Sequence, residues 1–258
     1  MSIIGYNIDM QNSGGSKQVS EQVNDTPQPT IIPLSPIRKA IADRMVLSKT
    51  TMPHAYVIMD VDMTAALKFR GEFNTRGHGN EAGAKISVND LVLKAAALTL
   101  QKMPGVNATF EDNAVVLQPE VNVGVVVAIE GDEGILVPVI RNTDTRPIGE
   151  IAQEVRDKGG LARKKRLRAR DSMGGTFTIS NVGMFGVNYL IAVVQPPQVA
   201  IMGVGVVKKV PAVEEDQIVI KSVMGVTLSF DHRAVDGAVA AKFLNAFAEV
   251  LQTPAQLL

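Results

Sequence analysis

SFDHRAVDGA, residues 229–238, follows an apolar, β-branched run and precedes a helical pattern. The run predicts a strand through Phe230, and the pattern after it predicts the last helix of the chain. His232 therefore lies just past the end of a strand, where a fold can hold a reactive side chain still and leave it open to a substrate. Because an imidazole takes up and releases a proton near neutral pH, we place the chemistry of this chain at His232.

Helical and strand patterns are interspersed along the rest of the chain without strict alternation. Helices are predicted from Pro36 to Thr51 behind the N-cap Ser35, from Thr64 to about Arg76, from Ser87 to Met103, from Pro147 into Arg163–Arg170, and along the stripe Val239, Phe243, Phe247 and Val250. Strands are predicted at 54–62, 107–110, 114–117, 121–129, 135–140, 176–180, 198–207 and 218–230. We expect an α+β domain with a mixed β-sheet covered by helices.

Composition excludes several classes of function. The chain has no cysteine, so disulfides, thiolate catalysis and cysteine-ligated metals are ruled out. Its 258 residues carry a formal net charge of zero, no Trp and 4% aromatic residues, which argues against nucleic acid and against an anionic membrane as partners. No apolar run approaches the roughly 20 residues of a membrane span. We expect an intracellular, cytoplasmic protein, or one of the mitochondrial matrix if the source is eukaryotic.

The N-terminal residues 1–30 are rich in Ser, Gly, Asn, Gln and Asp and lack periodic hydrophobicity. This composition predicts a flexible tail or linker, with the folded domain at 31–258. The tail has no basic region followed by an apolar core, so we predict no signal peptide.

A metal site is one alternative interpretation of the His232 stretch, with Asp231 and Asp236 as the other ligands. Adjacent positions on a strand point to opposite faces, so Asp231 and His232 rarely share one ion. His54 and His78 show no matching spacing and are interpreted as structural or exposed. A histidine that only satisfies a core hydrogen bond is the plainest alternative. We predict no metal.

The second candidate site is GGTFTISNVGMFG, residues 174–186, where an alternating strand ends in hydroxyl and amide groups and enters a glycine-rich loop. An ordinary strand and turn would explain any one of these residues. Ser180 at the strand end could instead donate a hydrogen bond to a developing oxyanion. Thr178, two residues earlier on the same face, is the alternate donor.

Two other sequence features are weaker evidence for a function. The run Gly203-Val204-Gly205 has Lys208 where a dinucleotide-binding loop needs its third glycine. The basic segment Arg163–Arg170 is interpreted as the solvated face of a helix, or as an interface with an acidic partner, rather than as a nucleic-acid site.

Four motifs together resemble the catalytic domain of the dihydrolipoamide acyltransferases of 2-oxo acid dehydrogenase complexes. They are the histidine stretch at 229–238, the serine-bearing strand and loop at 175–186, PLSPIRKAIADRMVLSKTTMPH at 33–54 and QPPQVAIMGVG at 195–205. They occur in the family's order between Ile31 and Leu258. The resemblance implies the coenzyme A-dependent acyltransferase fold, which is like that of chloramphenicol acetyltransferase.

On this resemblance, the chain moves an acyl group between dihydrolipoamide and coenzyme A. His232 is then the general base, Ser180 the oxyanion donor and Asp236 a supporting group at the active site. Arg38 and Lys39, on the family's first helix, are candidates to bind the phosphates of coenzyme A. The resemblance does not distinguish acetyl, succinyl and branched-chain acyl groups.

The resemblance also implies assembly. Family members form homotrimers with the histidine from one chain and the serine from the next, and the trimers build a large hollow core. That core works with a 2-oxo acid decarboxylase, a dihydrolipoamide dehydrogenase and lipoyl domains. Leu257 and Leu258 are then an anchor on a neighbouring trimer rather than a frayed end.

Family members usually carry lipoyl domains and a subunit-binding domain, which the thirty residues before Ile31 cannot hold. This indicates either a shortened form or a variant that receives its lipoyl group from another chain. Two further functions stay open: a stand-alone acetyltransferase of the chloramphenicol type, and an assembly scaffold with a vestigial site. The match at 33–54 favours the dehydrogenase complexes over the first. Intact His232, Asp236 and Ser180 argue against the second.

Overall fold

The computed structural model describes residues 29–76, 85–131 and 134–258. The chain divides into two units, Met1–Pro33 and Leu34–Leu258. Of the first unit only residues 29–33 are described, and these contain no helix or strand. The predicted flexible tail therefore lies largely outside the described residues, as does His78 with its predicted loop.

The second unit contains every helix and strand of the described residues. The α-helices are α1 (Pro36–Thr51), α2 (Thr64–Arg76), α3 (Val88–Lys102), α4 (Ile148–Arg163) and α5 (Gly237–Gln252). The strands are β1 (His54–Asp62), β2 (Ala108–Glu111), β3 (Ala114–Leu117), β4 (Val123–Val125), β5 (Val127–Ala128), β6 (Ile135–Leu136), β7 (Val139–Ile140), β8 (Phe177–Asn181), β9 (Ala200–Glu214) and β10 (Gln217–Asp231). Three short 3-10 helices are η1 (Ala169–Ser172), η2 (Gly183–Phe185) and η3 (Pro254–Leu257).

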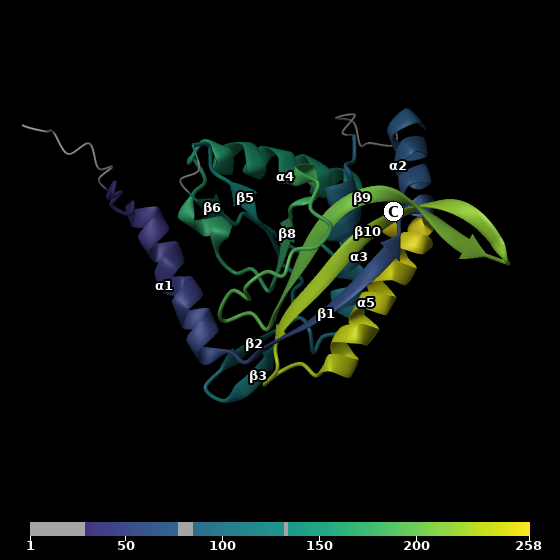
Figure 1. The fold of residues 1–258 in the computed structure, drawn as a ribbon. Helices are drawn as coiled ribbons and strands as arrows, with labels where there is room; N and C mark the ends of the chain where they lie inside the picture. The colour runs from purple at the N-terminus through teal and green to yellow at the C-terminus, as the bar shows by residue number, and fades with distance from the viewer. Residues whose placement is uncertain (1–28, 77–84, 132–133) are drawn as a thin grey trace, which may run out of the picture. The chain divides into compact units, whose positions relative to one another are not determined.

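The main sheet has six strands in the order β1-β10-β9-β8-β4-β7, and two further sheets pair β2 with β3 and β5 with β6. It is mixed, because β8 runs parallel to both β9 and β4 while the other neighbours are antiparallel. Helices α3 and α5 lie along one face of this sheet (Figure 1). The predicted α+β fold with a helix-covered mixed sheet is confirmed.

Polar caps fix where two of the helices begin. The Ser35 side chain accepts a hydrogen bond from the Arg38 amide at the start of α1, and Pro36 is the first helical residue. At the start of α3, Ser87 and Asp90 form the predicted capping box. Each cap satisfies amide groups that a helix leaves without partners in its first turn. These caps explain why both helix starts could be predicted from the sequence.

Over β9 and β10, the extended segment around Asn188 and Leu190 packs against the opposite face of the sheet. A side chain at Gly203 would place its Cβ 2.0 Å from the carbonyl oxygen of Leu190, and at Gly205 1.8 Å from that of Asn188. At Gly225 the same atom would lie 2.3 Å from the Asn188 oxygen. Glycine at these positions therefore lets backbone pack directly on backbone. Gly203 and Gly205 have this packing role, in keeping with the rejection of a dinucleotide-binding loop.

Two predicted strands are each broken in two. The run at 121–129 becomes β4 and β5, and the run at 135–140 becomes β6 and β7. Pro138 separates β6 from β7, and a proline has no amide to give to a sheet. Its carbonyl instead accepts from the Val125 amide at 2.9 Å. As a result β4 and β7 stay in the main sheet while β5 and β6 pair on their own.

Two other predictions are wrong. Helix α4 ends at Arg163, so the basic segment Arg163–Arg170 is not a helix face. Lys165 has a φ of 54° and turns the chain out of the helix.

The second wrong prediction concerns the C-terminal leucines. Leu257 is fully buried in the core, whereas Leu258 is 72% exposed. Only Leu258 is therefore open to a neighbour.

Among the described residues, no helix is long and apolar enough to cross a membrane.

Candidate active site

The His232 turn is fixed by its backbone. The Asp231 amide, at the end of β10, donates to the carbonyl of Val199, and the Asp231 carbonyl accepts from the amides of Ala234 and Val235. The His232 amide donates to the carbonyl of Pro53 at 2.9 Å. A turn held by this many bonds keeps the side chain that it carries in one place.

The Asp231 carboxylate completes the turn. It is fully buried, and it accepts hydrogen bonds from the amide and the guanidinium of Arg233, the shortest at 2.6 Å. These bonds raise the pKa of Arg233 above its ordinary value, and the guanidinium also lies 4.0 Å from the ring centre of Phe110. Asp231 is thus committed to a structural ion pair.

The His232 imidazole stays accessible while its backbone is held. Its side chain is 51% exposed, and its ring centre lies 5.7 Å from that of Phe230. The Asp236 carboxylate is 4.0 Å from Nδ1 and is 82% exposed. This distance is longer than a hydrogen bond, so the Asp236 carboxylate lies near the imidazole without being hydrogen-bonded to it. Within the described part of the chain, no three acidic or histidine side chains are grouped as metal ligands.

Ser180 and Thr178 differ in what their hydroxyls contact. Thr178 is buried on β8, and its hydroxyl donates to Oε1 of Gln198 at 2.7 Å. The Gln198 amide in turn donates to the carbonyl of Gly175 at 2.9 Å. Ser180 is half-buried at the end of the same strand, and its hydroxyl has no hydrogen-bond partner among the described residues. The Ser180 hydroxyl is therefore the one available to donate outward.

Ser180 and His232 lie far apart within one chain. Ser180 on β8 pairs with Gly203 on β9, which pairs with Thr227 on β10. His232 comes five positions after Thr227. At about 3.3 Å per position along a strand, and about 4.8 Å between strands, the two residues are separated by roughly 19 Å. One chain cannot bring both side chains to the same reacting atom.

Two adjoining cavities lie between α1, the β6–β7 segment and the prolines before β9. One, of about 400 Å³, is lined by Ile37, Ile41 and Arg44 of α1; the other, of about 210 Å³, is lined by Arg44 and by Gly174 and Gln198. Arg44 therefore borders both cavities. It lies seven positions after Ile37, two helical turns along the same face, and this spacing is the signal by which sequence reasoning could have found it.

The two cations predicted to bind coenzyme A lie elsewhere on α1. Lys39 is exposed, and its ammonium contacts Asp43 at 3.1 Å. Arg38 is exposed as well, and neither side chain lines the two α1 cavities.

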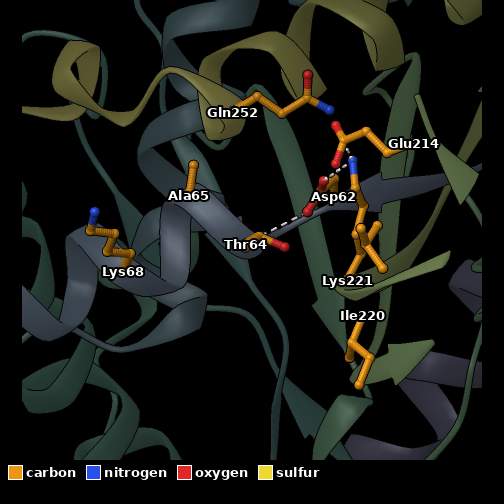
Figure 2. Close-up of a pocket in the computed structure, with 9 residues that line it drawn as sticks. Asp62, Thr64, Ala65, Lys68, Glu214, Ile220, Lys221 and Gln252 are labelled. Carbon is orange, nitrogen blue, oxygen red and sulfur yellow. Dashed lines mark hydrogen bonds and ion pairs between the residues drawn. The ribbon is translucent and has the colours of Figure 1, made fainter. Parts of the chain in front are cut away.

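A larger cavity of about 670 Å³ lies at the other end of β10 (Figure 2). There the Lys221 ammonium contacts Asp62 at 3.3 Å and Glu214 at 3.1 Å, and these hydrogen bonds raise the pKa of Lys221. Lys221 is ten positions before Asp231, or roughly 33 Å along the strand. This cavity, larger than the two beside α1, is therefore remote from His232.

Comparison with known proteins identifies the family of this chain. The sequence model of the family described as 2-oxoacid dehydrogenases acyltransferase (catalytic domain) matches residues 26–258. The chain is 40% identical over 251 residues to the dihydrolipoyllysine-residue acetyltransferase component of the pyruvate dehydrogenase complex of Rickettsia bellii, covering 96% of this chain. A second relative, from Zymomonas mobilis, carries the same description and is 39% identical over 235 residues, or 91% of this chain. The chain spans 59% and 52% of the length of these two curated relatives.

Solved structures give the same result. The dihydrolipoamide acetyltransferase of Azotobacter vinelandii, studied for the role of a serine, a histidine and an asparagine in catalysis, superposes with a TM-score of 0.84 at 30% identity over 90% of this chain and 95% of that one. The cubic core of the pyruvate dehydrogenase multienzyme complex gives the same TM-score, identity and coverage. A chloramphenicol acetyltransferase, with a TM-score of 0.50 at 14% identity over 81% of this chain and 94% of that one, shares the fold alone. The chain belongs to the family of 2-oxoacid dehydrogenase acyltransferase catalytic domains.

Proposed function

We propose that this chain transfers an acetyl group between dihydrolipoamide and coenzyme A, as the catalytic core of a pyruvate dehydrogenase-type complex. The relatives from Rickettsia and Zymomonas are described as acetyltransferases of that complex, which favours acetyl over succinyl and branched-chain groups. The chain matches them across most of its own length. Its greater likeness to them than to chloramphenicol acetyltransferase argues against the stand-alone enzyme.

The assignment of the site rests on sequence spacings that this chain shares with a solved relative. In the Azotobacter enzyme, the histidine studied for its catalytic role follows the serine by 52 residues and precedes the asparagine by 4. Here His232 follows Ser180 by 52 residues and precedes Asp236 by 4. We assign Ser180 and His232 to the two matching roles, with Asp236 at the position of the asparagine. Thr178 becomes the weaker candidate because its hydroxyl already donates a hydrogen bond to Gln198.

The reaction is thioester exchange, and each residue has one task in it. The thiol of the acceptor has a pKa of about 8.5, so it is mostly protonated at neutral pH and needs a base. The His232 imidazole takes this proton as the sulfur attacks the thioester carbonyl, and returns it to the departing thiolate. The Ser180 hydroxyl donates to the oxyanion of the tetrahedral intermediate. No acyl-enzyme is needed, because both substrates bring their own sulfur.

The separation of roughly 19 Å between Ser180 and His232 supports a site shared by two copies of the chain. We propose a homotrimer in which His232 of one chain and Ser180 of the next face one another. The segment after Ser180 supports such a contact, because Met184, Phe185 and Ile191 are 74%, 73% and 53% exposed. Apolar side chains gathered next to a catalytic residue are typical of a surface covered by a partner.

The rest of the assembly follows from the relatives. The cubic core to which this chain is similar supports assembly of the trimers into a large hollow core. We propose the 2-oxo acid decarboxylase, the dihydrolipoamide dehydrogenase and lipoyl domains as partners. The cytoplasm, or the matrix in a eukaryote, stays the predicted location.

Coenzyme A is proposed as a substrate rather than a resident cofactor. Its pantetheine arm would fit the two cavities beside α1, the larger of which has mainly apolar walls, and Arg44 is the cation that borders both. Arg38 and Lys39 stay candidates for its outer phosphates, from the exposed side of the same helix.

Subunit complementation tests this function and its shared site together. His232→Ala and Ser180→Ala proteins are each prepared, then unfolded and refolded as a one-to-one mixture. Acetyl transfer from acetyl-coenzyme A to free dihydrolipoamide is measured for the mixture and for each variant alone. Random assortment gives one intact histidine–serine pair at roughly a quarter of the sites, so the mixture recovers roughly a quarter of the wild-type turnover.

The two controls are each variant refolded alone, which stays inactive. A mixture no more active than its components overturns the shared site. A wild-type protein that forms trimers but transfers no acetyl group to dihydrolipoamide overturns the proposed function and leaves an assembly scaffold.

A further inference from the structure

His54, at the start of β1, has both ring nitrogens engaged. The Val194 amide lies 3.2 Å from Nε2, and the carbonyl of Met52 lies 2.9 Å from Nδ1. An amide can only donate and a carbonyl can only accept, so Nε2 carries the lone pair and Nδ1 carries the proton. The surroundings therefore fix one neutral tautomer of His54.

Ser48 and His54 together hold the backbone of Val194, an arrangement that we call the Val194 clasp. The Ser48 hydroxyl, buried at the end of α1, donates to the carbonyl of Val194 at 2.5 Å and lies 3.5 Å from Nε2 of His54. The Ser48–His54 pair thus satisfies both the amide and the carbonyl of one buried residue. Val194 also packs against Met52 and Ile201 in a small apolar cluster of its own.

The Val194 clasp lies between the catalytic histidine and the α1 cavities. On one side, His54 pairs with Asp231 across β1 and β10, and the carbonyl of the preceding Pro53 accepts from the His232 amide. On the other side, Gln195 follows Val194 directly and lines both α1 cavities. A shift of His54 would therefore move His232 through the hydrogen bond from the His232 amide to Pro53. It would also move Gln195 in the cavity wall through the hydrogen bond from the Val194 amide to His54.

We propose that His54 is a positioning residue. By accepting a hydrogen bond from the Val194 amide, its ring fixes the position of His232 relative to the cavity wall at Gln195. The inference rests on the proposed function, because it needs His232 to be the base. A misplacement of about 1 Å at a reacting group can cost about 10²-fold in rate. Loss of the acceptor is therefore expected to lower kcat by about 10- to 100-fold.

Two substitutions separate the two ring nitrogens. His54→Asn keeps a donor near the position of Nδ1 and loses the acceptor for Val194. His54→Gln places a side-chain oxygen near the position of Nε2 and keeps that acceptor. We expect His54→Asn to lower kcat per folded trimer by about 10- to 100-fold, and His54→Gln to restore it to within a few-fold of wild type. Tyr56→Phe is the matched control, because it removes only the exposed bond from Lys49 between the same helix and strand.

A double-mutant cycle distinguishes positioning from a loss of stability. Turnover is measured well below each melting temperature for His54→Asn, His232→Ala and the double variant. If His54 acts through His232, adding His54→Asn to His232→Ala has little further effect on the residual rate. The inference fails if the two losses multiply, if His54→Asn keeps wild-type kcat, or if His54→Gln is as slow as His54→Asn. A His232→Ala protein with wild-type turnover instead overturns the proposed function.

Discussion

The two ends of the β9–β10 hairpin are built from the same pair of strands and differ in how they are held. At the histidine end, where β10 finishes at Asp231, the strand residues are buried and the next turn is tied by several backbone bonds. At the turn end, Val213 and Ile218 are 75% and 82% exposed. There Lys221 forms ion pairs with Glu214 on β9 and with Asp62 at the end of β1.

This difference teaches that the size of a cavity is a poor guide to the site here. The cavity of about 670 Å³ at the turn end, between the hairpin, α2 and the last residue of α5, is larger than the two cavities beside α1 (Figure 2). His232, the side chain expected to act as the base, lies at the other end, where several backbone hydrogen bonds hold the turn. Catalysis needs groups held within a fraction of an ångström, and ion pairs near the surface do not provide that.

The largest effect is expected at the histidine end, and one substitution at each end of the hairpin tests this. His232→Ala removes the general base and should lower kcat by about 10²- to 10⁴-fold, whereas Lys221→Ala should leave turnover close to wild type. Steady-state acetyl transfer measures both, with melting curves to confirm folding. A large loss of turnover in Lys221→Ala would break the comparison, because it would place chemistry at the turn end.

A second comparison uses the two leucines at the C-terminus, whose 3-10 helix contacts α2. Leu257→Ala opens a cavity in the core and should lower the free energy of unfolding by about 2–5 kcal/mol. Leu258→Ala should change it by less than about 0.5 kcal/mol. Chemical denaturation measures both. If size-exclusion chromatography then shows Leu258→Ala as trimers in place of the large particle, Leu258 is the anchor between trimers; an unchanged particle rules out that role.

The next comparison is between the hydroxyls of Ser180 and Thr178 on β8, the two candidates for the oxyanion donor. Ser180→Ala should lower kcat by about 10²-fold with little change in KM, because its bond forms only in the transition state. Thr178→Val leaves the buried Gln198 oxygen without its donor and should lower stability by about 1–3 kcal/mol, with a smaller effect on kcat. Kinetics and melting curves of both variants separate the two roles. The opposite pattern would assign the oxyanion donor to Thr178.

The smallest effect concerns pH at the turn end. Burial alone would raise the pKa of Asp62, but hydrogen bonds from Thr64 and Lys221 together outweigh it and hold the pKa below its ordinary 3.8. A lowered pKa stabilises the folded state above pH 3.8, and this stabilisation is lost as the pH falls through the lower folded-state value. Asp62→Asn should therefore show a smaller drop in stability than wild type between pH 5 and pH 2, measured by denaturation. Equal drops would show that the ion pair contributes nothing.

Much of the fold could be predicted because its signals are local. The Ser35 and Ser87 caps and the strand at 54–62 involve residues close together in the sequence, and the structure places each of them as predicted. The breaks within 121–129 and 135–140 could not be predicted in the same way. They depend on which segments pair across the sheet, and Pro138 shows its effect only once its neighbour is known.

The same distinction between local and long-range signals applies to the candidate site. The sequence by itself determined the family, the reactive types of His232 and Ser180 and their spacing, because side-chain chemistry and local pattern are properties of the chain. Only the tertiary structure decided that the two residues lie far apart in one chain and that the Thr178 hydroxyl donates a hydrogen bond to Gln198. It alone also decided that Arg44 borders the cavities and that Leu257 is buried. Strand register and packing bring together residues that are far apart in sequence, and no local pattern records which ones will meet.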